Sequence, residues 1–369
     1  MSEVKHLIPN VPKYFKTNLH THSTITDGKL SPEELKELYK QHGYQVLCIS
    51  DHNVVVDHSA LNDENFLLLT GAEFGVSEPG QDALYKKSYH INCISKFPDN
   101  NWQPLLPRKP REATLPYLEK VECPDIPRSH CVESLNEIIQ KCNEHGYLVI
   151  YNHPVWSLHN YNDYAPLEGL WGMEICNYNC LYSGRDTYST IPYRDFLEQN
   201  KRLVPIGSDD MHTIKFFAGA WIMVGAEKLT YESVIAALEK GDLYASTGPE
   251  IYDITLEGAT LKVSCSDATS VVVESDCRFA KRALPTQSDG LMRQATFDLT
   301  KWIEGTQSHE TADRAYIRIT VNGPYGHRAF TRAYFYASLS ILFWLYYLIF
   351  RWWQEMGQYP QRDNQYHYN

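Results

Sequence analysis

The chain has few basic residues for its size. Its 369 residues include 34 Lys and Arg against 45 Asp and Glu, which gives a formal net charge of −11. A broad surface for duplex nucleic acid needs clustered Lys and Arg, so this composition argues against duplex DNA or RNA as a partner. Short oligonucleotides and single nucleotides remain open as substrates.

Three other absences narrow the class of protein. Residues 1–12 contain no long apolar core and therefore do not resemble a signal peptide, so we expect a cytoplasmic catalytic part. No internal repeat is visible. The nine cysteines are odd in number and scattered, and Cys176 and Cys180 lack a second pair. This favours a reduced intracellular protein over a disulfide or zinc framework.

The most informative feature that is present is a series of His, Asp and Glu residues in the first 212 positions. Each lies just past, or at the end of, a short apolar run. The series comprises His20, His22, Asp27, His52, Glu73, His90, His153, Asp210 and His212. Imidazole and carboxylate are ligands for Zn²⁺, Mn²⁺ and Fe²⁺, and nine such groups exceed the needs of one ion. The series predicts a centre of two or three ions, of the kind that hydrolyses esters.

The apolar runs predict the fold that carries this centre. Seven short runs, mostly without alternation, cover residues 15–19, 46–49, 66–69, 89–94, 148–151, 170–175 and 203–206. Such runs are typical of parallel strands buried on both faces. Helices are predicted from Ser31 to Gly43, from Ser134 to Gly146 and from Tyr193 to Leu197, the first with a capping box. The pattern predicts a seven-stranded α/β barrel with the centre at its mouth.

The pattern changes after a predicted helix at residues 230–240. Alternating or β-branched runs at residues 251–256, 261–265, 271–273, 295–299 and 315–321 are separated by turn residues. They predict a small antiparallel β module resembling a sandwich. The expected organisation is a barrel at 1–248, a β module at 249–335, and an apolar C-terminal segment with a polar tail at 336–369.

The C-terminal segment has no charge between Ala333 and Phe350 and is flanked by Arg332 and Arg351. Its length and its aromatic rim permit a membrane span, which would tether the protein to a membrane. Two other interpretations stay open. One is a helix buried on the barrel or in an oligomer, and the other is a terminal sequence altered relative to related proteins.

Several strings in this chain resemble the polymerase-and-histidinol-phosphatase (PHP) superfamily. They occupy residues 18–23, 27–28, 49–53, 71–73, 90–92, 152–154 and 207–212, and the resemblance covers about residues 13–250. It implies a distorted seven-stranded (β/α) barrel, two or three divalent ions and phosphoester hydrolysis.

The resemblance also implies a distribution of the ligands. His20, His22, Glu73 and Asp210 would hold one ion; Glu73 would bridge to a second held by His90 and His153; and Asp27, His52 and His212 would hold the third. Many relatives carry a histidine where this chain has Asp27. The Asp-x-His spacing favours Asp210 over Asp209 as a ligand. Asp209 and Asp51, each beside a ligand, are expected to support the ligands from behind.

The chemistry follows from the charges. The carboxylates of Asp27, Glu73 and Asp210 contribute three negative charges, and two or three divalent ions contribute four to six positive ones. Such a centre attracts phosphate and lowers the pKa of a bound water from about 16 towards about 7. Hydroxide then serves as the nucleophile, with Glu73, Asp210 and His212 as the catalytic candidates.

Two basic residues and one insertion are the candidates for binding the substrate. Arg185 and Lys215 lie in loops after the last two predicted barrel strands and are the candidates for phosphate binding. A proline-rich insertion at residues 97–128 carries Arg108, Lys109 and Arg111. It is either a lid or specificity loop, or simple surface decoration.

These observations predict a metal-dependent phosphoesterase that hydrolyses a small phosphorylated substrate, a phosphomonoester or a nucleotide. Three alternatives stay open: a short-oligonucleotide exonuclease, a metal-dependent hydrolase of non-phosphate bonds, and a non-catalytic metal-binding regulatory module. The oligomeric state is not predicted.

Overall fold

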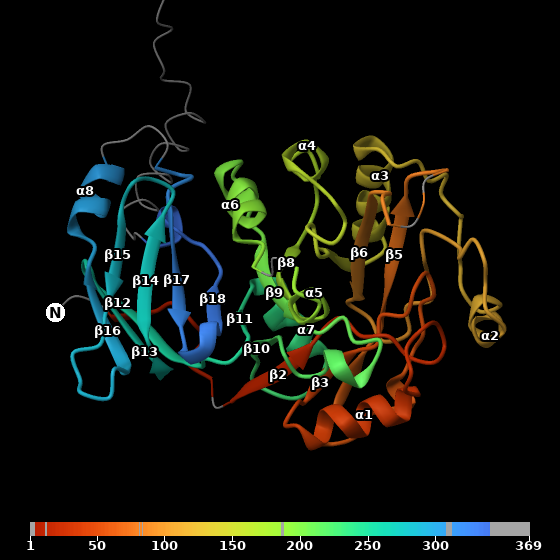
Figure 1. The fold of residues 1–369 in the computed structure, drawn as a ribbon, viewed down its shortest axis with the longest axis horizontal. Coiled ribbons are helices and arrows are strands. Elements are labelled where there is room, and N and C mark those ends of the chain that lie inside the picture. Colours follow the sequence, from red (N-terminus) through yellow and green to blue (C-terminus); the bar gives the residue numbers. More distant parts are fainter. Residues whose placement is uncertain are drawn as a thin grey trace, which may run out of the picture.

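The computed structural model describes residues 4–11, 13–80, 82, 84–185, 188–307 and 312–339. The described chain is a mixed α/β structure with two units side by side (Figure 1). An α/β unit from the N-terminal two thirds lies on the right of the view, and a β module from the C-terminal third lies on the left. Sheet and helix therefore divide broadly as the sequence predicts.

Two sheets build the α/β unit. In one, β2 (Tyr14–Asn18), β3 (Val46–Cys48) and β4 (Leu67–Leu69) are parallel, and β10 (Trp221–Gly225) and β11 (Leu243–Ser246) extend it beyond β2 in antiparallel fashion. The other has the order β5 (Gly71–Ser77), β6 (Ser88–Ser95), β7 (Tyr147–Tyr151), β8 (Gly172–Asn177) and β9 (Val204–Ser208). All seven predicted strands are present, and β5, β10 and β11 were not predicted.

The expectation of parallel strands throughout is wrong at β6. This strand pairs antiparallel with both β5 and β7. The described residues between β5 and β6 contain no helix, and the chain reverses into an antiparallel neighbour instead of crossing over the sheet. The start of β6 therefore lies at the same edge of the sheet as the ends of β7, β8 and β9.

The two sheets of this unit adjoin at β9 and β10. A Cβ atom added to Gly207 would lie only 2.6 Å from the backbone oxygen of Trp221, so glycine permits the close approach of these strands. Among the described residues, however, the hydrogen-bonded ladders form separate sheets and do not close into one barrel.

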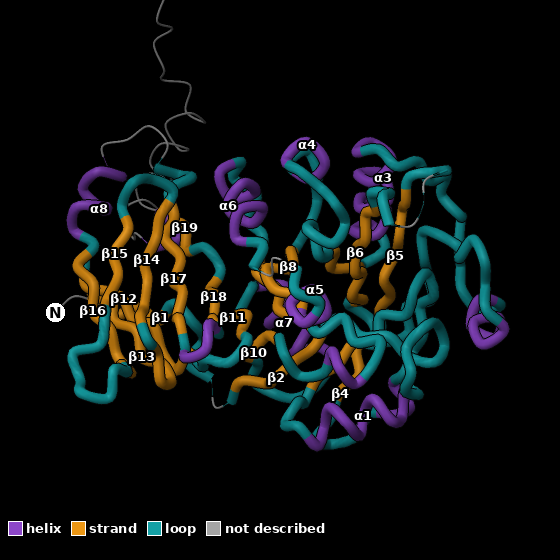
Figure 2. The backbone as a smooth tube through the Cα atoms, viewed as in Figure 1, coloured by secondary structure: helices purple, strands orange, loops and turns teal. Residues whose placement is uncertain are grey.

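In the view of Figure 2 several helices lie at the outer edges of the α/β unit, and others overlap its strands. They are α1 (Pro32–Gln41), α2 (Leu115–Leu118), α3 (Val132–Glu144), α4 (Tyr161–Tyr164), α5 (Tyr178–Tyr182), α6 (Thr190–Glu198) and α7 (Tyr231–Lys240). The predicted capping box of α1 is present: the Ser31 side chain accepts the Glu34 backbone N–H, and the Glu34 carboxylate accepts the Ser31 N–H. Gly43 follows α1 with φ +79°, the predicted left-handed position.

The β module is a sandwich of antiparallel sheets. One sheet has the order β1 (Val4–His6), β12 (Ile251–Glu257), β13 (Thr260–Ala268) and β16 (Met292–Asp298). The other runs through β15 (Ala280–Ala283), β14 (Ser270–Ser275), β17 (Tyr316–Asn322) and β18 (Arg328–Thr331), with β19 (Tyr334–Phe335) beside β17 and α8 (Thr300–Gln307) nearby. Ile254, Val263, Val273 and Ile319 are buried between the sheets.

Two features join the units more closely than the sequence suggests. Strand β18 pairs with β11, so one sheet runs from the module into the α/β unit. Strand β1 pairs with β12, and Leu7 and Ile8 are buried in the core of the module. Residues 4–8, which the predicted division assigns to the barrel, therefore pack in the second unit.

The predicted apolar segment at 333–350 begins inside the module. Ala333, Tyr334, Phe335 and Tyr336 are buried, and α9 (Tyr336–Leu339) ends the described chain. Residues 340–350 lie outside the described residues. Within the part of the chain that the structure describes, no helix is long and apolar enough to cross a membrane.

Candidate metal centre

The structure brings all nine predicted ligands to one edge of the α/β unit. His20 and His22 follow β2, His52 follows β3, and Glu73 lies on β5. His90 lies near the start of β6, which faces this edge because the strand is reversed. His153 follows β7, and Asp210 and His212 follow β9.

Backbone hydrogen bonds fix the loops after β2 and β9 against each other. The N–H of Asp210 donates to the His20 carbonyl at 2.9 Å, and the N–H of His22 donates to the Met211 carbonyl at 3.0 Å. The two loops pair like short strands at Thr21 and Met211. The His-Thr-His and Asp-Met-His strings are 190 positions apart in the chain, and this pairing places them side by side.

A first group of ligand atoms surrounds the Nε2 atoms of His20 and His22, which are 3.2 Å apart. Asp210 Oδ1 lies 3.3 Å from His20 Nε2 and 3.2 Å from His22 Nε2. Glu73 Oε1 lies 3.4 Å from His20 Nε2. An ion bound tetrahedrally at about 2.0–2.1 Å from each ligand separates the ligands by about 3.3 Å. These spacings therefore suit a shared ion.

Glu73 lies at the middle of the centre and is buried. Its Oε1 is 2.8 Å from His90 Nδ1 and 3.3 Å from His153 Nε2. Its Oε2 is 2.9 Å from His52 Nδ1. The two oxygens therefore face different sets of histidines, as a bridging carboxylate requires. Burial disfavours the charged form of Glu73, but His90, His20 and His52 outweigh burial and hold its pKa well below the usual value.

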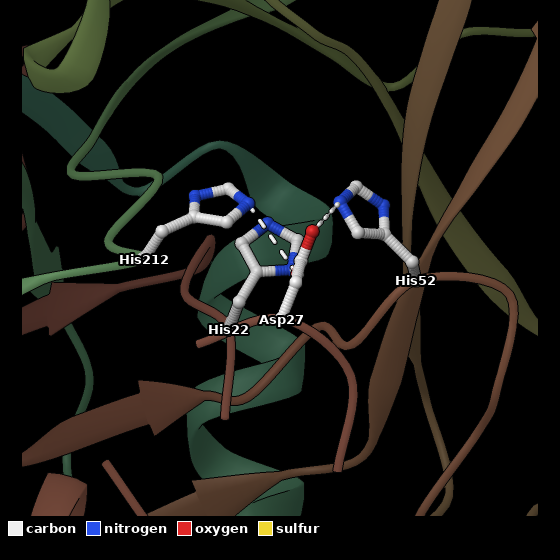
Figure 3. A group of neighbouring side chains, drawn as sticks. All are labelled: His22, Asp27, His52 and His212. Carbon is white, nitrogen blue, oxygen red and sulfur yellow. Dashed lines mark ion pairs between the residues drawn. The ribbon is translucent and has the colours of Figure 1, made fainter. Parts of the chain in front are cut away.

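A third group surrounds Asp27 (Figure 3). The carboxylate lies 3.5 Å from His52 Nε2, 3.5 Å from His212 Nε2 and 3.9 Å from His22 Nδ1. His22 Nδ1 and Asp27 Oδ1 are buried, and neither has a hydrogen-bond partner among the described residues. Buried polar atoms normally have partners, so these two atoms are suited to bind a cation between them.

The observed groups overlap more than the implied distribution. His22 lies with Asp27, His52 and His212 as well as with His20 and Glu73. His153 lies with His20 and Asp210 as well as with Glu73 and His90. The difference arises because His22 presents one ring nitrogen to each side, which sequence spacing does not reveal.

Two ligand positions have a strained backbone. His153 has φ +21° and Asp210 has φ +49°, both in the left-handed region that residues with a Cβ rarely adopt. Such conformations cost of order 1–3 kcal/mol each and are retained chiefly at functional sites. From these positions His153 Nε2 lies 3.3 Å from Glu73 Oε1, and Asp210 Oδ1 lies 3.3 Å from His20 Nε2.

The sequence analysis missed one carboxylate, Glu174 on β8. It is 2% exposed, and its Oε1 accepts a hydrogen bond from His20 Nδ1 at 2.7 Å. Its Oε2 accepts the backbone N–H of His153 at 2.8 Å and the side-chain amide of Asn177 at 3.0 Å. A carboxylate behind a histidine fixes which ring nitrogen is free to bind metal. The available signal was a glutamate inside an apolar predicted strand.

Asp51 and Asp209 hold the loops that carry ligands rather than the ligand side chains. Asp51 accepts the Ser23 N–H at 2.9 Å and the Ser23 hydroxyl at 2.5 Å. Asp209 accepts the Tyr39 hydroxyl at 2.9 Å and the backbone N–H groups of residues 218–220. Burial raises the pKa of Asp209 to about 6 despite these bonds. Both carboxylates therefore support the loops, whereas the sequence analysis expected them to support the ligand side chains directly.

The histidines of the centre differ in pKa according to their neighbours. Burial, together with the nearby His52 and His212, lowers the pKa of His22 to about 4. Burial also disfavours the charged form of His52, but Glu73 and Asp27 outweigh it and raise the pKa of His52 to about 9. His22 is therefore neutral and able to bind a cation at pH 7, whereas His52 must lose a proton first.

The two residues predicted to bind phosphate, Arg185 and Lys215, are exposed. Arg185 follows α5, and Lys215 lies in the short turn Ile214–Phe216. The cavity beside Asp27 and His52 is lined by other cations, from the insertion at 97–128, and its lining includes neither Arg185 nor Lys215. The sequence placed both residues by loop order alone, which does not determine how far a loop reaches over the centre.

Comparison with known proteins yields structural similarity only. No family model and no curated protein matches the chain. It is similar to a two-domain protein from Bacteroides vulgatus containing a predicted PHP-like metal-dependent phosphoesterase, at 15% identity and a TM-score of 0.43, over 79% of this chain and 88% of that one.

Two further structures are similar over a smaller part of the chain. One is a proposed metal-dependent phosphoesterase from Bifidobacterium adolescentis, at 18% identity and a TM-score of 0.34, over 56% of this chain and 89% of that one. The other is an amidohydrolase from Chromobacterium violaceum with bound sulfate and no metal, at 16% identity and a TM-score of 0.35, over 53% and 87%. At these values the similarities carry no weight for the activity of this chain, and the functional conclusion depends on the geometry of the centre.

Proposed function

We propose that this protein is a metal-dependent hydrolase of phosphoesters that acts on a small phosphorylated substrate. The observation that carries the proposal is the spacing around Glu73: its two carboxylate oxygens each face histidine nitrogens from different strands, 2.8–3.6 Å away. A carboxylate that bridges two ions holds them close together, and pairs of ions about 3.5–4 Å apart serve in the hydrolysis of phosphoesters.

The proposed ligand sets follow the observed groups. His20, His22 and Asp210 would hold one ion with Glu73; Glu73, His90 and His153 would hold a second; and Asp27, His52 and His212 would hold a third, with His22 at its edge. Imidazole and carboxylate ligands suit Mn²⁺, Zn²⁺ or Fe²⁺. When bound, such ions activate water and stabilise charge on the attacking and leaving oxygens.

The chain itself supplies orientation and charge. Glu174 accepts the Nδ1–H of His20 and thereby directs the free Nε2 lone pair into the centre. Glu73 and Asp210 keep a negative charge, since the pKa of each is held below its usual value by the histidines in spite of burial. His20, His22 and Glu73 are almost fully buried, which removes competing water from the centre.

Closure of the strands into a barrel is part of the same proposal. We infer that β2 to β4 and β5 to β9, with β10 between β2 and β9, form a distorted barrel whose mouth carries the centre. The close approach of Gly207 to Trp221 supports this inference. The chain is acidic, and its positive charge would be concentrated at the metal centre, so we expect it to prefer compact phosphates to duplex nucleic acid. We place this activity in the cytoplasm.

A screen of phosphate release tests the proposal. The metal-loaded protein is incubated with phosphomonoesters, nucleotides and short oligonucleotides, with Mn²⁺, Zn²⁺ and Fe²⁺ in turn. We expect release from a small phosphoester that disappears in Glu73→Gln and persists in the control Glu168→Gln, whose carboxylate is exposed away from the centre. Processive release of mononucleotides would favour an exonuclease, and hydrolysis of carboxyl esters or amides alone would refute the phosphoesterase.

A further inference from the structure

A cavity of about 240 Å³ opens directly beside the third ligand group. Its lining includes Asp27, His52 and Asn53 from the loops of the centre and Arg108, Lys109 and Arg111 from the insertion at 97–128. Three cations from one short stretch therefore line the same small space as two residues of the metal centre.

The insertion is built against the loops of the centre. Gln103 is fully buried, donates from Nε2 to the Asn53 carbonyl at 3.2 Å, and accepts the Val55 N–H at 3.0 Å. Further along, the Arg111 guanidinium donates to the carbonyl of Thr26, the residue before Asp27. These contacts favour a specificity element over surface decoration, the two interpretations that the sequence left open.

The charge of this cavity is positive. Arg108, Lys109 and Arg111 contribute three positive charges, and Asp27 is the one carboxylate in the described lining. Asp27 is itself engaged with His52 and His212. The Arg111 guanidinium donates to the Thr26 carbonyl, whereas the exposed Arg108 and Lys109 side chains make no hydrogen bond or ion pair within the described part of the chain.

We propose that this cavity binds a second anionic group of the substrate, a phosphate or a carboxylate, distinct from the phosphate that is hydrolysed. The proposal rests on the proposed function, since it places the scissile phosphate at the ions around Glu73. Pockets for whole drug-sized ligands measure about 300–1,000 Å³, so a cavity of this size suits one charged group rather than a complete nucleotide. The substrate class is therefore a small molecule with an anionic group at each end.

Binding measurements test this without requiring turnover. The metal-loaded protein is titrated calorimetrically with methylphosphonate and with bisphosphonates that have one to four methylene groups between the phosphonates. At least one bisphosphonate should bind about tenfold or more tightly than methylphosphonate, since charge-assisted contacts to Arg and Lys are the strong ones. Phosphonocarboxylates of the same length distinguish a carboxylate pocket from a phosphate pocket.

The variants locate the effect. In Arg108→Ala/Lys109→Ala the advantage of the bisphosphonate should fall to about twofold or less, while methylphosphonate binding and metal content stay unchanged, because the removed contacts bind only the second group. Lys120→Ala, an exposed lysine of the same insertion outside the cavity, serves as the matched control and should behave as the unaltered protein.

Two results would overturn the proposal. One is a bisphosphonate advantage that survives in Arg108→Ala/Lys109→Ala, which would assign both phosphonates to the ions. The other is an equal weakening of both ligands, which would show that the cations act only through their general field. Failure of the proposed function is distinguishable from either, because it would appear as absent phosphoester turnover with the binding pattern intact.

Discussion

Replacement of Glu174 by Gln tests the carboxylate behind the metal ligands. The Gln side chain has nearly the same shape, so the buried site keeps its volume. Glu174 now accepts from four donors: His20 Nδ1, the Ser208 hydroxyl, the His153 N–H and the Asn177 amide. An amide has only one acceptor oxygen, so one pair of these donors must face an NH₂ group.

Either orientation of the amide harms the centre. If the NH₂ group faces His20, that ring must accept at Nδ1 and carry its proton at Nε2, which then cannot bind metal. If the NH₂ group faces His153 and Asn177, the buried backbone N–H of His153 loses its acceptor, at a cost of about 1–3 kcal/mol, and the Asn177 amide keeps only Asp210 Oδ2 at 3.2 Å. Changes to residues that orient metal ligands typically lower metal affinity or activity about 10–100-fold.

The assay is metal affinity, measured by competition with a chromophoric chelator, together with the metal content after dialysis. We expect Glu174→Gln to bind about 10–100-fold more weakly, equivalent to about 1.4–2.8 kcal/mol, while the circular dichroism spectrum stays unchanged. The control is Glu168→Gln, which removes an exposed carboxylate just before the same strand. Unchanged metal affinity in Glu174→Gln would refute the proposed role of this carboxylate.

Three further changes test other parts of the centre. His20→Ala/His22→Ala should remove at least one ion per chain by elemental analysis and nearly all turnover while the fold persists; full metal content would contradict the ligand assignment. Metal loading at pH 7 should release protons, because His52 with a pKa of about 9 is protonated without metal, so affinity should rise with pH up to about 9. Calorimetry in buffers of different ionisation enthalpy counts these protons, and a count of zero would refute the protonation state. Gly28→Ala should disturb the loop of Asp27 and lower metal content, since its Cβ would lie 2.0 Å from the His22 carbonyl oxygen; Gly305→Ala on α8, where a Cβ would meet no atom of the described residues within 4 Å, is the control.

Local signals in the sequence predicted the elements well. The capping box at Ser31 and the left-handed position at Gly43 are properties of a few neighbouring residues, and both are present in the structure. The seven apolar runs predicted the strands because a strand that is buried on both faces is apolar at nearly every position. The direction of β6 was not predictable in this way, since it depends on how the chain folds back after residue 77.

The same distinction applies to the centre. The sequence by itself determined the nine candidate metal ligands, because ligand chemistry is a property of residue type and each candidate lies beside a recognisable strand. Only the tertiary structure decided that Glu73 faces two sets of histidines, that Glu174 lies behind His20, and that Arg108 rather than Arg185 borders the cavity beside Asp27. These relations join residues far apart in the chain, and they depend on strand direction, loop reach and burial, which no local pattern of residues encodes.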